Sequence, residues 1–411
     1  MKATKKMSSP ELMKYIIEEV QKEGVVGEED SITVLTLKIM LRLVKNANPT
    51  SSNVLVSDQT GGGKDFLTKN VCKVLLEEDL SFFHRTTISP KTLNYWQPRI
   101  DKKEVSWNGK VLYLEDPEED AIKSQAFKVM ASGGTKMTVI KDQKVLDRKI
   151  DGKPVIIVTS MKTQIDVEGQ RRWDAIRIDT SQQLSKNVVN ASLMNAMGLT
   201  TSDPSDKKFR ELLRSLRSYE VIIPWATELS STFTNPRMVE RTQVNKLLDY
   251  IKASAVLHQD NRQIDSYGRL LAEKEDYELA RFAYIQLRNK EGNALNKAEE
   301  TLLDYLREKG EPVKLTQITT ELVAVSKTWL YEHKEDMVEK GVISTITKFD
   351  SGVNREVEHL EAVYSKKQTK DLPSGKKLLG IDGYISSGKF YEEINSKRKQ
   401  KGLLPIFQKV L

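Results

Sequence analysis

Residues 53 to 65 carry a glycine-rich loop that ends in a lysine, Asn-Val-Leu-Val-Ser-Asp-Gln-Thr-Gly-Gly-Gly-Lys-Asp. An apolar strand leads into the loop and a helix is expected after it. The three consecutive glycines let successive backbone N–H groups point at an anion, at the positive end of that helix. Lys64 would reach the terminal phosphates of a nucleotide. The pattern predicts an ATP site formed by Thr60, Gly61, Gly62, Gly63, Lys64, Asp65 and Phe66.

Two positions depart from the usual pattern G-x-x-x-x-G-K-[ST]. Asp58 stands where the first glycine belongs, and Asp65 replaces the hydroxyl residue that normally binds magnesium. Taken alone, the loop therefore favours nucleotide binding over hydrolysis. The alternative is a glycine-rich turn between a buried strand and a helix.

An acid pair follows about fifty residues after the loop lysine, where the apolar run 111–114 ends in Glu115 and Asp116. A nucleotide hydrolase needs one carboxylate to hold Mg²⁺ and a second to orient or deprotonate the attacking water. We assign Glu115, with Asp65, to the metal, and Asp116 to the water, although the two adjacent acids are exchangeable. A solvated turn is the alternative.

Two further polar sites follow short apolar runs. The run 155–158 ends in Thr159 and Ser160, either of which would touch the γ-phosphate or the water, unless this is simply the end of a buried strand. Arg172 belongs to the segment Arg171-Arg172-Trp173-Asp174, which immediately precedes the run 175–178, and would lie on a subunit edge. The alternative for Arg172 is a surface ion pair with Asp166, Glu168 or Asp174.

The composition sets limits on the class of protein. With 411 residues the chain is long enough for two or three domains. No apolar run approaches the roughly 20 residues that span a bilayer, and no apolar segment follows the basic N-terminus. We therefore expect no membrane insertion and an intracellular, cytoplasmic protein. One cysteine and four scattered histidines exclude a thiolate or histidine metal cluster, so any metal should arrive with the nucleotide.

The net charge of +7 lies in the C-terminal tail. Residues 365–411 contain eleven Lys or Arg and four acids, whereas the rest of the chain is neutral. A basic tail suggests a polyanion partner such as nucleic acid, and a solubilising terminus is the alternative.

The pattern of apolar residues predicts an α/β fold. Helices are expected at 11–22 and around 32–43. Apolar runs at 53–56, 82–88, 111–114, 155–159 and 175–178 then alternate with helices at 65–77 and 90–96. This alternation is typical of a parallel sheet flanked by helices. After Ser181 the sheet should end, with helices at 207–218, 241–259 and 277–288.

A separate unit is expected at 297–364. Helices that end near 309, 322 and 339 precede two strand-like runs, 342–349 and 356–364, which is the order of a winged helix. The stretch 326–334 falls where the recognition helix should be, which makes Lys327 and Lys334 candidate DNA contacts. Three acids in 332–336 dilute this charge and leave a protein-binding role open.

A lysine-tipped hairpin is predicted between the acid pair and Val155. Two β-prone runs surround the polar turn that contains Lys141 and Lys144. These lysines would bind DNA phosphates without base specificity, or would simply protect an exposed strand edge.

Taken in order, the loop lysine, acid pair, polar strand end, arginine and helical lid resemble AAA+ ATPases over residues 30 to 260. The resemblance implies that Arg172 completes the site of a neighbouring subunit in a ring, expected to be a hexamer. Arg172-Trp173-Asp174 resembles the Arg-Phe-Asp of minichromosome-maintenance helicases, whose hairpin before the first-sensor strand grips DNA in the pore. Residues 247–259 resemble the lid helix of primase-helicase-like ATPases of mobile elements, and Arg237 and Arg241 are second-sensor candidates.

The sequence thus predicts an AAA+ core of parallel sheet and flanking helices, a helical lid and a winged helix. The expected segments are N-terminal helices (1–48), ATPase core (49–235), lid and linker (236–295), winged helix (296–365) and basic tail (366–411). We expect an ATP- and Mg²⁺-dependent DNA helicase of a mobile element. The alternatives are an origin-binding initiator or loader that uses ATP as a switch, and a nucleotide-binding scaffold without turnover.

Overall fold

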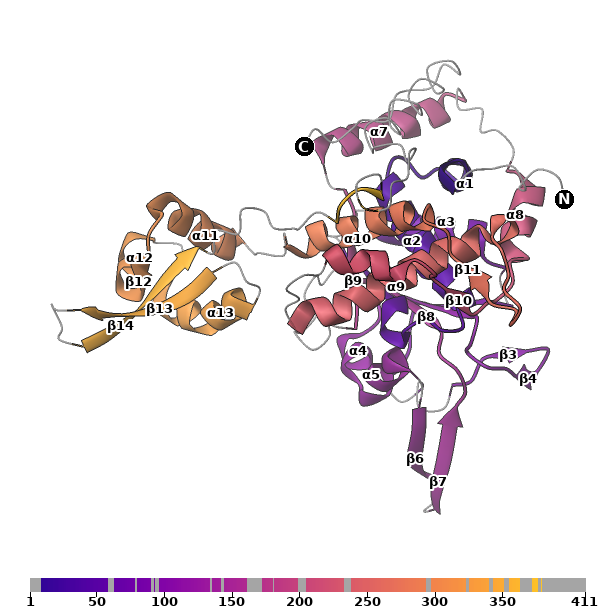
Figure 1. Cartoon of the computed structure of the whole chain (residues 1–411), viewed down its shortest axis with the longest axis horizontal. Coiled ribbons are helices and arrows are strands. Elements are labelled where there is room, and N and C mark those ends of the chain that lie inside the picture. Colours follow the sequence, from indigo (N-terminus) through magenta and orange to yellow (C-terminus); the bar gives the residue numbers. More distant parts are fainter. Residues whose placement is uncertain are drawn as a thin grey trace. The chain divides into compact units, whose positions relative to one another are not determined.

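The computed structural model describes residues 9–57, 63–77, 80–89, 92, 96–133, 135–141, 144–160, 172–179, 181–198, 205–232, 238–292, 297–322, 325–339, 343–350, 355–362, 372–375 and 378. The chain forms two compact units, the first comprising residues 1–287 and 373–411 and the second residues 288–372 (Figure 1). Among the described residues, no helix is both long and apolar enough to cross a bilayer. The predicted helix at 90–96 lies largely outside the described residues.

A five-stranded parallel sheet forms the centre of the first unit, which confirms the predicted α/β class. Its order is β2 (Phe82–Arg85), β5 (Val111–Glu115), β8 (Val155–Ser160), β1 (Asn53–Ser57) and β9 (Asp174–Arg177). Strands β1 and β8 are buried along their whole length, which explains their continuous apolar runs. In the sheet, β8 lies between β5 and β1, and β1 is the strand that leads into the glycine-rich loop.

Helices cover both faces of this sheet. On one face α3 (Lys64–Leu75) contacts β1 and β8, and α2 (Glu29–Met40) contacts α3, β9 and α9 (Met238–Leu257). Helix α1 (Ser9–Gln21) packs on α2 and α3. On the other face Leu55, Leu112, Leu114, Ile156 and Val158 share one apolar cluster with α4 (Glu119–Lys123) and α5 (Gln125–Ser132). Successive strand residues thus alternate between the two helical layers.

The chain after Ser181 is mainly helical and adds no strand to the central sheet, as predicted, although a small separate sheet was not expected. Strand β10 (Val221–Ile222) pairs in parallel with β11 (Leu270–Leu271). The helices here are α7 (Gln182–Ala196), α8 (Lys207–Arg214), α9 and α10 (Asp276–Gly292). Short 3-10 helices occupy Leu41–Leu43, Pro49–Ser52, Ala226–Thr232 and Gln259–Asn261.

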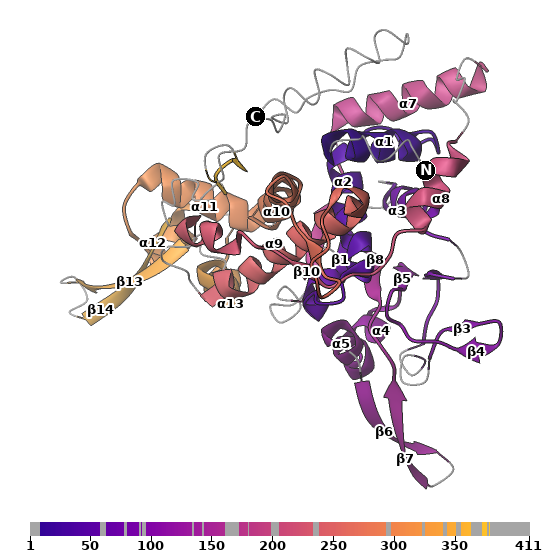
Figure 2. The same ribbon diagram turned by 45° about the vertical axis from the view of Figure 1, so that its right-hand side comes forward.

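Two antiparallel hairpins extend from the first unit. The smaller pairs β3 (Arg99–Ile100) with β4 (Lys103–Glu104), and the larger pairs β6 (Thr135–Lys141) with β7 (Lys144–Ile150). The larger one is the predicted lysine-tipped hairpin, with longer strands than expected. It projects away from the central sheet in both views (Figures 1 and 2).

The second unit contains three helices and a three-stranded antiparallel sheet. The elements run α11 (Lys297–Lys309), β12 (Val313–Lys314), α12 (Leu315–Glu321), α13 (Lys327–Glu339), β13 (Ile343–Asp350) and β14 (Arg355–Ala362). The sheet order is β12-β14-β13, so a short strand joins the two predicted ones. Leu302, Leu306, Ile318, Leu330 and Leu360 lie in the core of this unit.

Candidate nucleotide-binding site

The glycine-rich loop leaves the carboxyl end of β1 and leads into the first turn of α3. Gly63 caps this helix with φ 85°, a conformation that glycine adopts without strain. Lys64 is the first residue of α3 and its side chain is largely buried, whereas Phe66 is exposed. Thr60, Gly61 and Gly62 lie outside the described residues. The helix N-terminus and Lys64 together place positive charge beside the loop.

Asp65 joins three of the elements that meet at this edge of the sheet. The Tyr113 hydroxyl on β5 donates to Asp65 Oδ1 at 3.0 Å and lies 3.2 Å from Thr159 Oγ1 on β8. Lys64 Nζ lies 3.3 Å from Asp65 Oδ2. Burial opposes the charge, but hydrogen bonds from Thr159 and Tyr113 and the Lys64 ammonium hold the pKa of Asp65 below its usual range. Asp65 is therefore an ionised carboxylate at neutral pH.

Glu115 lies at the end of β5, directly beside Thr159 in the sheet register. One carboxylate oxygen accepts from Lys69 Nζ of α3 at 2.7 Å, and the other lies 2.8 Å from His84 Nε2 of β2. Asp116 follows with φ 45° and an exposed side chain, and its N–H donates to the Thr159 carbonyl. The two acids therefore differ in environment: Glu115 is held by two cationic or polar groups, and Asp116 points to solvent.

Asp65 and Glu115 are the two acids that the sequence assigned to a magnesium ion. Both supply carboxylate oxygens, which hard cations prefer, at the same edge of the sheet. Among the described residues, no group of three or more His, Cys, Asp or Glu side chains is arranged to hold a metal ion. Magnesium suits such a sparse site because it keeps several waters and takes further ligands from phosphates.

Arg172 lies at the opposite end of the sheet from the glycine-rich loop. The Arg172 carbonyl accepts from Asn53 Nδ2 at 2.9 Å, and Asn53 is the first residue of β1. The loop leaves β1 after Ser57, so about 13 Å of strand separates the two positions. An arginine side chain is shorter than this distance. The Arg172 backbone is therefore separated by the length of β1 from Ser57, the last described residue before the loop.

Asp174, at the start of β9, is the centre of a buried polar cluster. Lys246 Nζ of α9 lies 2.6 Å from its Oδ1, and Lys38 of α2 and the Tyr250 hydroxyl both bond to its Oδ2. Burial disfavours the charge, but Lys246 and Lys38 outweigh it and hold the pKa of Asp174 well below its usual range. The idea that Asp174 forms a surface ion pair was wrong, because only 2% of it is exposed.

Helix α9, predicted as the lid helix, is fixed to the sheet by this cluster. Arg241 lies in its first turns, where only the backbone is described, and Arg237 lies outside the described residues. His258, at its end, is buried and lies 2.7 Å from the Ser254 carbonyl. These contacts give His258 a packing role.

Lys141 and Lys144 are backbone partners at the tip of the larger hairpin, where only the backbone is described. In the second unit Lys327 is exposed at the start of α13, whereas Lys334 lies 2.6 Å from Glu358 of β14. Trp329 packs partly against the core of this unit. Lys334 is therefore already neutralised by an acid of its own unit.

The sequence did not indicate three residues that complete the site. Tyr113 faces Asp65 from inside a strand whose apolar run concealed it, and burial raises the pKa of its hydroxyl well above the usual range, so it remains a donor. Lys69 and His84 hold Glu115. The polar hydroxyl of Tyr113 within an apolar run was a signal that could have identified it. Nothing in the sequence pattern pointed to Lys69 or His84.

Comparisons with known proteins address the first half of the chain. None of the curated proteins matches the chain. A family model described as the MTBMA_p00010 P-loop domain matches residues 2–216, which include the loop, the acid pair, Thr159 and Arg172. P-loop domains bind nucleoside triphosphates through such a loop and lysine. Since the match spans more than half of its residues, the chain belongs to the MTBMA_p00010 P-loop domain family.

Proposed function

We propose that this chain is an AAA+-type ATPase that drives a helicase or translocase on DNA, in the replication of a mobile element. The observation that carries the proposal is the separation of Arg172 from Lys64 across the length of β1. From this separation we infer that Arg172 does not serve a γ-phosphate held by Lys64 of the same chain. Each arginine would instead complete the site of the next subunit, in a ring such as a hexamer.

The site residues divide the chemistry of ATP hydrolysis between them. Lys64 and the α3 N-terminus would bind the phosphates, and Asp65 and Glu115 would hold Mg²⁺, which would supply positive charge near the phosphate oxygens. Asp116 is free of the contacts that hold Glu115 and orients or deprotonates the attacking water, with Thr159 beside it. Tyr113 positions Asp65 through its hydroxyl. The partner's arginine stabilises the transferring phosphoryl group.

Contact with DNA falls to the projecting hairpin. Lys141 and Lys144 are paired in the register at its tip and would bind phosphates without reading bases. Replacing both by Ala should abolish DNA stimulation of the ATPase while ATP binding survives. Unchanged stimulation would remove the hairpin from the mechanism.

The second candidate function is an initiator or loader that uses ATP as a switch. It is favoured by the second unit, whose three helices and terminal β-hairpin are the elements of a winged helix, with α13 as the recognition helix and Lys327 exposed on it. ATP-dependent binding to a particular duplex without strand separation would favour this function over the motor.

Subunit mixing tests the shared site directly. Lys64→Ala removes the lysine that binds the phosphates and keeps Arg172. Arg172→Ala removes the arginine and keeps Lys64. Each variant alone should lose nearly all ATPase activity, whereas a mixture should recover part of it, because some interfaces then combine an intact loop with an intact arginine. Arg217→Ala, which removes an exposed arginine elsewhere, is the matched control and should keep its rate. Full activity of Arg172→Ala, or no recovery on mixing, would contradict the proposal.

A further inference from the structure

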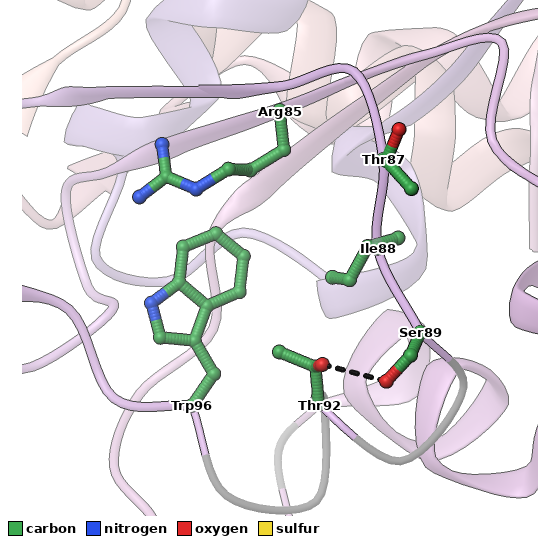
Figure 3. A pocket seen from close by; sticks show the side chains of 6 residues that line it. All are labelled: Arg85, Thr87, Ile88, Ser89, Thr92 and Trp96. Atoms are coloured by element: carbon green, nitrogen blue, oxygen red, sulfur yellow. Dashed lines mark hydrogen bonds between the residues drawn. The ribbon is translucent and has the colours of Figure 1, made fainter.

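The edge strand β2 of the central sheet ends in Arg85, which lies between two hollows. The first hollow has a volume of about 480 Å³ and is lined by Arg85, Thr87, Ile88, Ser89, Thr92 and Trp96 (Figure 3). The second, of about 320 Å³, is lined by Arg85 and Arg99 together with apolar residues and Asp101. Because Arg85 lines both, the hollows adjoin each other. Neither includes a residue assigned above to ATP or to the hairpin tip.

Arg85 and Trp96 form a stacked pair at the mouth of the first hollow. The Arg85 guanidinium lies 4.9 Å from the centre of the Trp96 ring. One of its N–H groups donates to the His84 carbonyl at 2.6 Å, which leaves the other edge of the planar fork for a ligand. A guanidinium oriented in this way suits bidentate binding of a phosphate.

The Trp96 ring is held in place from behind. The fully buried Trp107 meets it edge-on, with ring centres 5.1 Å apart at 87°, and the Trp107 indole N–H donates to the Trp96 carbonyl. A fixed ring binds a planar partner without losing rotamer freedom on binding. Trp96 is therefore a preformed platform and not a mobile surface side chain.

Hydroxyl groups complete the first hollow. Ser89 and Thr92 share a hydrogen bond of 2.9 Å across its lower rim, and Ile88 and Thr92 point toward the Trp96 ring (Figure 3). The hollow thus combines one cation, one aromatic face, an aliphatic wall and several hydroxyls. A nucleoside phosphate has the matching groups: an anion, a planar base and a polar sugar. The volume lies within the range of small-ligand pockets.

We propose that this hollow binds a nucleoside phosphate unit of single-stranded nucleic acid, with the phosphate on Arg85 and the base against Trp96. A paired base in a duplex cannot enter it, whereas an unstacked base can. The adjoining hollow, with Arg99, gives the next unit of the strand a place on the other side of Arg85. This inference goes beyond the ATPase proposal, because it needs neither turnover nor a ring.

Binding of a fluorescein-labelled oligothymidylate to the full-length protein, without ATP, tests the inference. Arg85→Ala should weaken binding about tenfold, and Trp96→Phe, which keeps a smaller ring against Trp107, about threefold. Arg217→Ala removes the same charge elsewhere and should stay within about twofold of the unchanged protein. Circular dichroism checks that each variant is folded.

The outcomes separate the possible sources of the ligand. Thymidine monophosphate could quench the tryptophan fluorescence of the unchanged protein but not of Arg85→Ala, while the oligonucleotide fails to bind. That result would assign the hollow to free nucleotides. Equal affinity of Arg85→Ala and Arg217→Ala for the oligonucleotide, with no such quenching, would overturn the inference. Since no ATP is present, failure of the ATPase proposal would leave either result unaffected.

Discussion

The cluster around Asp174 makes a quantitative prediction about charge balance in the core. Two ammonium groups, Lys38 and Lys246, share one carboxylate, and all three are buried. Asp174→Asn keeps the shape of the side chain but leaves two buried cations without a counter-charge. Removing one partner of a buried pair costs about 3–5 kcal/mol. Lys246→Met instead leaves one cation facing one anion, so its cost should stay within about 1 kcal/mol.

Urea unfolding, followed by tryptophan fluorescence and circular dichroism, measures the difference. With a urea dependence of about 3 kcal/mol/M, Asp174→Asn should lower the midpoint by about 1 M or more, and Lys246→Met by a few tenths. Glu104→Gln, which breaks the exposed pair with Arg99, is the control and should not shift the midpoint measurably. Because the pKa of Asp174 is lowered, its contribution is present above the unfolded pKa and is lost only as pH falls toward the folded pKa. The difference should therefore stay constant from pH 5 to 8.

Two results would refute this reasoning. One is a Lys246→Met variant as unstable as Asp174→Asn, which would mean that the hydrogen bonds matter more than the charge balance. The other is an Asp174→Asn midpoint equal to that of Glu104→Gln, which would mean that the cluster contributes no net stability.

Three further predictions follow from single contacts. His84→Ala frees one oxygen of Glu115, so half-maximal ATPase should need less magnesium; an unchanged requirement would exclude Glu115 as a ligand. Burial raises the pKa of Glu29 to about 7, so the native state keeps a proton that the unfolded state loses, and stability falls by up to about 3 kcal/mol as pH rises from 4.5 to 7. Glu29→Gln should abolish this slope in urea midpoints measured across that range. Gly152→Ala places a Cβ 2.6 Å from a backbone nitrogen and should lower the thermal midpoint more than Gly198→Ala, which has a similar φ and open space; equal shifts would rule out the steric cause.

The sequence was sufficient to locate the strands and the outline of the site. The strands at 53–57, 111–115 and 155–160 were predictable because strands buried on both faces are continuously apolar. Glycines, a lysine and acids at their ends then placed Lys64 and Glu115 at one edge, since parallel strands share their carboxyl ends. Helices α4 and α5 were not predicted, because both are too short to show a clear period.

The side chains that contact the site residues could not be predicted from the sequence, because they are remote along the chain. Tyr113 and Asp65 are 48 residues apart, and His84 and Glu115 are 31 apart. Asp174 looked like a surface acid beside Arg172 because its two lysines are 136 and 72 residues distant. Pairs of this kind depend on the packing of whole elements, and no local pattern encodes them.

The two hairpins of the first unit are joined at their bases by hydrogen bonds, and this has a mechanical consequence. The Gln97 side chain, just before β3, accepts from the Asp151 backbone N–H and donates to the Asp151 carbonyl, just after β7. The backbone N–H of Trp107 donates to the same carbonyl. A force applied at the tip of the larger hairpin is therefore borne by the segment that carries the smaller one. Asp151 lies four residues before Val155, where β8 begins, so the hydrogen-bonded bases of both hairpins are joined through the chain to the strand that carries Thr159.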